Sequence, residues 1–85
     1  MDFPRVMQAV DECEQMIQAH TVTVKKSAQL EHCLDMIRRM RAEFHEGKLG
    51  KAFRWLGFIQ GVMYAHGVAD IETLKRMNAP DEVKL

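Results

Sequence analysis

LGKAFRWLGFIQGVMYAH, residues 49–66, is the stretch that decides the fold. On a helix with about 3.6 residues per turn, its apolar side chains point in nearly every direction around the axis. A helix that is apolar all round is buried, either at the centre of its domain or at an interface with another chain. A chain of 85 residues offers little other protein to surround it. The stretch therefore predicts a buried helix over 49–66 and favours a homodimer.

Two glycines, Gly57 and Gly61, lie four residues apart within this helix, and each costs about 1 kcal/mol of helix propensity relative to alanine. Small residues let another backbone approach closely, and dispersion attraction between the two backbones offsets that cost. Two interpretations stay open, close packing within one subunit and close packing between subunits. For the second, we expect the interface to comprise Trp55, Gly57, Phe58, Gly61 and Val62.

Upstream of this stretch, two amphipathic helices are predicted, over about 3–20 and 24–46, because apolar residues recur there at steps of three and four. Asp2 is a suitable N-cap for the first helix. Gly47 is expected to end the second helix as a left-handed stop. A short link between the two helices predicts an antiparallel hairpin.

The link itself, Thr21-Val22-Thr23-Val24, is rich in β-branched residues and resembles a short strand. A strand without a partner strand elsewhere in the chain is implausible. We therefore expect a connector in which Thr21 or Thr23 caps the second helix.

Downstream, Gly67 is expected to end the helix over 49–66, and Asp70 to cap a short helix over about 71–78. Pro80 would stop this helix, leaving a frayed tail over 79–85. The prediction is a small all-α, four-helix domain, 1–85, with an N-terminal hairpin, a highly apolar third helix and a short fourth helix.

The composition is that of an ordinary globular protein, with 47% hydrophobic and 28% charged residues. Twelve basic and twelve acidic residues cancel, so the overall charge indicates neither nucleic acid nor membrane as a partner. No run reaches the roughly 18 apolar residues of a membrane span, and the start MDFPRV does not resemble a signal peptide. We expect a cytoplasmic protein.

Charge is nevertheless uneven along the chain. Residues 1–20 hold one basic and four acidic side chains, whereas 38–54 hold six basic and two acidic ones. The interpretations left open are a solvated face that favours the helix dipole, a surface for an acidic protein, and a nucleic-acid or nucleotide site. The candidate partner-binding residues are Arg38, Arg39, Arg41, Lys48, Lys51 and Arg54.

Motifs for chemistry are weak. Cys13 and Cys33 fall on apolar helix faces and are interpreted as buried reduced thiols, with a disulfide or redox switch as the alternative. No metal-ligand spacing is present, and histidines near helix ends, such as His20, His45 and His66, are more often caps. No nucleophile motif surrounds Ser27 and no phosphate-binding loop occurs. We expect no catalytic residue, no metal and no cofactor, and therefore not an enzyme.

One block carries a resemblance. Residues 48–64, KLGKAFRWLGFIQGVMY, followed by Gly67 and by 70–78, DIETLKRMN, are similar to the C-terminal half of small accessory proteins of tailed bacteriophages. The N-terminal hairpin is not shared. The resemblance implies an early or accessory protein in a bacterial cytoplasm that binds and blocks a host protein, with anti-CRISPR-like counter-defence as one form.

The expected function is thus stoichiometric binding of a host protein. The alternative is a small nucleic-acid- or nucleotide-binding protein that uses the basic cluster of residues 38–54. A structural assembly protein is the third option.

Overall fold

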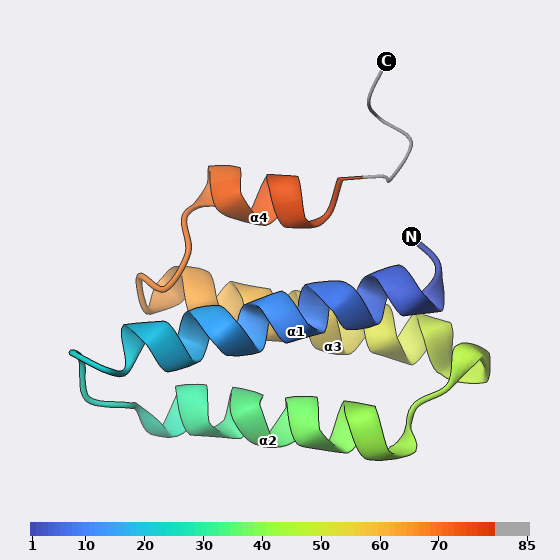
Figure 1. Ribbon diagram of the computed structural model, residues 1–85, viewed down its shortest axis with the longest axis horizontal. Helices are drawn as coiled ribbons and strands as arrows, with labels where there is room; N and C mark the ends of the chain where they lie inside the picture. Colours follow the sequence, from blue (N-terminus) through green and yellow to red (C-terminus); the bar gives the residue numbers. More distant parts are fainter. Residues whose placement is uncertain (80–85) are drawn as a thin grey trace.

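The computed structural model describes residues 1–79, which fold into four α-helices and one 3₁₀ turn. The helices are α1 (Phe3–His20), α2 (Ala28–Glu43), α3 (Leu49–Ala65) and α4 (Ile71–Met77), and the turn η1 (Glu46–Lys48) precedes α3. No strand occurs in this part of the chain, so the predicted small all-α domain is confirmed (Figure 1). Pro80 and the tail predicted beyond Ala79 lie outside the described residues.

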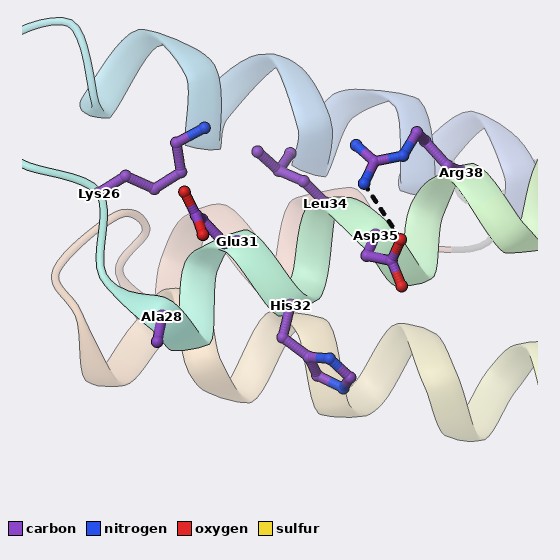
Figure 2. A pocket seen from close by; sticks show the side chains of 7 residues that line it. All are labelled: Lys26, Ala28, Glu31, His32, Leu34, Asp35 and Arg38. Carbon is purple, nitrogen blue, oxygen red and sulfur yellow. Dashed lines mark hydrogen bonds and ion pairs between the residues drawn. The ribbon is translucent and has the colours of Figure 1, made fainter.

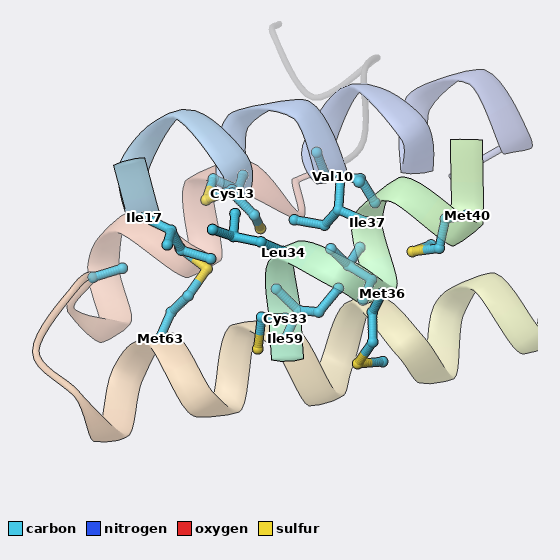
Figure 3. Packing of buried hydrophobic residues seen from close by; sticks show 14 of the residues in the cluster. Val10, Cys13, Ile17, Cys33, Leu34, Met36, Ile37, Met40, Ile59 and Met63 are labelled. Carbon is cyan, nitrogen blue, oxygen red and sulfur yellow. The ribbon is translucent and has the colours of Figure 1, made fainter. Parts of the chain in front are cut away.

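The first three helices form the core. Each of α1, α2 and α3 packs against the other two, and α4 lies on the side of α1 and α3 away from α2 (Figure 1). Figure 3 shows the side chains that fill the space between the three helices. They include Val10, Cys13, Ile17, Cys33, Ile37, Met40, Ile59 and Met63, all buried.

Hydrogen bonds from side chains attach α4 to this core. The Arg5 guanidinium of α1 donates to the backbone carbonyl of Met77 at 2.6 Å. Gln60 of α3 and Asn78 exchange two amide hydrogen bonds, at 3.0 and 2.8 Å. Leu74 and Met77 are buried beneath α4. The short helix is therefore held by polar pairs as well as by its apolar face.

The start of α2 differs from the sequence prediction. Ser27, not Thr21 or Thr23, is its N-cap, and the Ser27 hydroxyl accepts a hydrogen bond from the Leu30 N–H at 3.1 Å. The Thr21 hydroxyl instead donates to the Ile17 carbonyl at 3.0 Å, so it completes the end of α1. The connector runs over 21–27, and the predicted boundary at 24 was wrong because Thr21 already serves the preceding helix.

The end of α2 also differs. Gly47 is not a left-handed stop, since within residues 1–79 only Gly67 has a positive φ, 74°. The helix ends at Glu43 because Phe44 adopts an extended backbone, with φ −90° and ψ 149°. His45 Nδ1 then accepts from the Gly47 N–H at 3.1 Å and caps η1.

Three other helix ends agree with the sequence prediction. Asp2 Oδ1 accepts from the Arg5 N–H at 3.0 Å, and Asp70 Oδ1 from the Thr73 N–H at 2.8 Å. Beyond α3, the Val68 N–H donates to the Met63 carbonyl and the Gly67 N–H to the Tyr64 carbonyl, at 2.8 and 3.1 Å. This pair of bonds is the Schellman arrangement, which requires the left-handed residue that Gly67 supplies.

Within this one chain, the third helix is buried on one side only. Ala52, Leu56, Ile59, Gln60 and Met63 are buried, while Phe53, Phe58 and Tyr64 are 40%, 51% and 54% exposed. The Cα atoms span 36 × 33 × 16 Å. A body this thin has room for about two helix diameters of about 10 Å, which leaves one side of α3 uncovered.

Candidate functional site

A cleft of about 420 Å³ lies between α2 and α3, and we call it the α2–α3 groove. Helix spacing explains its walls, since residues at steps of three and four share a face. The lining residues of α2 follow one another at steps of four and three, so they share one face of that helix. The lining residues of α3 lie within four residues of one another. The lining residues are His32, Met36 and Arg39 of α2 and Arg54, Trp55 and Phe58 of α3.

The floor of the groove is apolar and aromatic. Met36 is buried, Trp55 is half-buried, and Phe58 is half exposed. The Trp55 ring packs against Phe44 with centroids 4.9 Å apart, and the His32 ring meets Phe58 edge-on at 6.1 Å. The extended backbone at Phe44, which ends α2, thus places a ring against the groove's tryptophan.

Two cations lie over this aromatic pair. The Arg39 guanidinium carbon is 6.0 Å from the centroid of the Trp55 ring, and Lys51 Nζ is 5.3 Å from it. Lys51 Nζ is also 5.5 Å from the centroid of Phe44. These distances are those of cation–π contacts, which contribute about 0.5–1 kcal/mol each at an exposed site.

The six basic candidate residues do not lie together in one cluster. Arg41 points to α1, where its guanidinium donates to Asp11 at 2.6 and 3.2 Å and to Glu14 at 2.6 Å. These hydrogen bonds, to Glu14 first and to Asp11 second, raise the pKa of Arg41. Arg38 pairs with Asp35 at 3.1 Å on the exposed surface of α2. Both arginines therefore already have carboxylate partners within the chain.

The other four basic candidates lack such partners. Within residues 1–79, no carboxylate lies within 4.0 Å of the charged groups of Arg39, Lys48, Lys51 or Arg54. The fold brings Arg39, Lys51 and Arg54 to the region of Trp55, and Lys48 precedes α3 on the surface. The groove thus has a positive rim to which the described residues supply no negative counter-charge.

A second hollow, of about 500 Å³, lies along α2 and has a different character. Figure 2 shows Arg38, Leu34 and Lys26 pointing toward α1, while His32 points the other way, toward α3. The two basic side chains of this hollow are matched by two acidic ones, Glu31 and Asp35. It therefore carries no net charge, in contrast to the α2–α3 groove.

The five residues expected at an oligomer interface lie on two sides of α3. Trp55 and Val62, seven residues apart, share the half-buried side, whereas Gly57 and Gly61 are exposed on another. Phe58 lies between them and contacts His32. A Cβ added at Gly57 or Gly61 would meet no atom of another element within 4 Å in residues 1–79. No described part of the chain therefore packs closely against these glycines.

The cysteines are buried free thiols, as predicted. Burial raises the pKa of Cys13 to about 12 and that of Cys33 to about 11. A thiol that resists ionisation is a poor nucleophile and a poor metal ligand. In the described part of the chain, no three His, Cys, Asp or Glu side chains come together as metal ligands would.

Sequence reasoning missed His32, Met36 and Phe44 as parts of the site. The spacing of His32, Met36 and Arg39 could have indicated a shared helix face. No pattern in the sequence showed that Phe44 would leave the helix to contact Trp55, because that contact joins two elements.

No helix among residues 1–79 is both long and apolar enough to cross a lipid bilayer. Comparison of the chain with protein-family models, with curated proteins and with solved structures finds no match.

Proposed function

We propose that this chain is a non-enzymatic accessory protein that binds another protein and blocks it by covering a functional surface. The observation that carries the proposal is the positive rim of the α2–α3 groove, where Arg39 and Arg54 flank Trp55 and no carboxylate of the described residues pairs with them. Arginine and tryptophan are the side chains that most often dominate binding energy at protein interfaces. Their gathering at one exposed groove favours a binding role.

The proposed target is a host bacterial protein, because residues 48–78 resemble phage accessory proteins. A component of bacterial defence is the specific case that an anti-CRISPR-like role would require. Blocking by occlusion needs no chemistry from the chain. It needs only a complex stable enough to compete with the natural partner of the target.

Affinity capture from bacterial lysate, with and without nuclease, tests the proposal. We expect one protein in stoichiometric amount that survives nuclease treatment, and inhibition of its activity when this chain is added. Recovery of the chain alone would contradict the proposal and favour an assembly role.

Nucleic-acid binding is the second candidate. Unpaired cations beside an aromatic ring suit single-stranded nucleic acid, which binds through phosphate contacts and base stacking. Lys51 and Arg39 already lie over the Trp55 ring, however, and a base would have to displace them to stack there. A plot of the logarithm of oligonucleotide affinity against the logarithm of salt concentration would then have a negative slope of about 0.7 per phosphate contact. Such a slope would favour this candidate.

A homodimer through α3 is proposed as the state in which the chain acts. Phe53 and Tyr64 are about half exposed beside Gly57 and Gly61, at which the backbone of a second copy can approach closely. A fully covered aromatic side chain buries about 150–250 Å², and about half of each of these remains exposed, so association would remove further apolar surface from water.

A further inference from the structure

We infer that the α2–α3 groove receives an acidic peptide segment in which carboxylates flank one apolar anchor side chain. This inference rests on the proposed function and specifies the chemistry of the partner. The groove joins an apolar floor to a rim of two arginines, and an occupant must satisfy both.

The volume of the groove and its apolar floor indicate the size and character of the anchor side chain. A cleft of about 420 Å³ lined by Met36, Trp55 and Phe58 offers an apolar surface between two helices. Pockets that hold a ligand commonly have volumes of about 300–1,000 Å³ with mainly apolar linings. Methionine adapts its shape to different apolar groups, which suits a leucine- or phenylalanine-sized side chain.

The two arginines at the rim of the groove indicate the charge of the peptide groups on either side of the anchor. Arg39 stands on α2 and Arg54 on α3, so they contribute to the lining from opposite walls. Among residues 1–79, no acidic residue lines the groove and no carboxylate pairs with either arginine. A guanidinium binds a carboxylate through two parallel hydrogen bonds, which fixes the position of the partner group. Carboxylates on both sides of the anchor match this arrangement.

Two comparisons within the molecule favour a peptide over a nucleic acid. The hollow in Figure 2 has acidic residues beside its basic ones, whereas no acidic residue in the described part of the chain lines the α2–α3 groove. Nucleic-acid grooves present cations along a backbone path, with open aromatic faces for the bases. Here two arginines border a short cleft, and Lys51 and Arg39 lie over its tryptophan.

The test uses Trp55, the one tryptophan in the sequence, as an intrinsic fluorescent probe inside the groove. The full chain is titrated with a synthetic peptide that has a central leucine flanked by glutamates. Two matched peptides replace the glutamates with glutamine or the leucine with serine. We expect a saturable change in Trp55 emission with the first peptide and at least tenfold weaker binding with each of the others.

Matched variants assign binding to the groove. Arg39→Gln and Arg54→Gln should each weaken the peptide by about tenfold or more, because each removes a charge-assisted contact. Arg38→Gln is the control, since this neighbouring arginine has the same charge but pairs with Asp35 outside the groove. Equal losses in Arg38→Gln and Arg39→Gln would overturn the inference, as would saturable binding of oligo(dT) with no response to the peptide.

Capture from lysate separates this inference from the proposed function. If a host protein is captured equally by the native chain and by the Arg39→Gln/Arg54→Gln double variant, the groove inference fails and the proposed function stands. If no protein is captured by either chain, the proposed function fails. Loss of capture in the double variant alone, with Arg38→Gln unchanged, supports both.

Discussion

Arg41 shows at the scale of one residue how position decides the use of a charge. In sequence it is one of six neighbouring basic residues, yet its guanidinium spans from α2 to Asp11 and Glu14 of α1. Arg39, two residues earlier, points to the α2–α3 groove instead. Two residues correspond to about 200° around a helix, so the two side chains leave α2 on opposite sides.

Replacing Arg41 should affect stability rather than binding. We expect Arg41→Gln to lower the free energy of unfolding by about 1 kcal/mol, a modest value because the arginine side chain is 39% exposed and solvent screens the pair. Urea unfolding at low salt and at about 1 M salt measures this, and the difference from the native chain should shrink at high salt. An equal loss in Arg38→Gln, whose pair is more exposed, would contradict the explanation.

The buried thiols make stability depend on alkaline pH. The pKa of Cys13 is raised from 9.0 to about 12 by burial, so the unfolded chain releases this proton at lower pH than the folded chain. The stabilisation is complete below pH 9 and is lost as pH rises toward about 12. By pH of about 11 the loss from this one thiol should be on the order of 3 kcal/mol.

Urea unfolding at several pH values measures this loss. Cys13→Ala removes the titrating group, and its stability should decline less steeply above pH 9 than that of the native chain. Parallel curves for the two proteins would show that Cys13 is not the source of the loss.

At the scale of the elements, capping residues set the helix boundaries. Ser27 begins α2, and Thr21 completes α1 by donating to the Ile17 carbonyl. Phe44 and His45 then turn the chain into η1, which leads into α3. Each junction satisfies backbone groups that a helix end leaves without partners.

A pair of alanine substitutions tests the start of α2. Ser27→Ala should reduce the free energy of unfolding by about 1 kcal/mol, because the Leu30 N–H loses its acceptor. Thr23→Ala should change it little, since Thr23 is exposed and is not the cap of either helix. Thermal unfolding followed by circular dichroism compares the two, and a larger effect at Thr23 would contradict the assignment of the cap to Ser27.

At the scale of the whole molecule, thinness is the dominant feature. A body only 16 Å deep between its Cα extremes covers α3 on one side and leaves three aromatic side chains about half exposed on it. Exposed apolar surface that is contiguous commonly marks an interaction site. The proposed dimer would bury the part of this surface around Phe53 and Tyr64, whereas Phe58 lines the α2–α3 groove.

Gly61→Leu tests the dimer without disturbing the monomer. A side chain at this position enters open space, and replacing glycine within a helix by a better helix former favours folding by up to about 1 kcal/mol. Analytical ultracentrifugation should therefore show a well-folded monomer for Gly61→Leu and a dimer for the native chain. A native chain that sediments as a monomer at high concentration would refute the dimer.

Local patterns were sufficient for part of this structure. Apolar residues at steps of three and four indicated the helices, and Asp2, Gly67 and Asp70 indicated three of their ends, because periodicity and capping depend on residues within one turn. The burial of Cys13 and Cys33 followed from the same spacing.

Only the tertiary structure decided which basic residues are free to bind. Arg41 is paired across two helices, 30 residues from Asp11 in sequence, and Phe44 leaves α2 to contact Trp55 of α3. The tertiary structure also decided that α3 is covered on one side, because this coverage depends on how the three core helices pack into a domain of small thickness. Contacts between elements depend on the packing of the whole chain, and no local pattern in the sequence contains them.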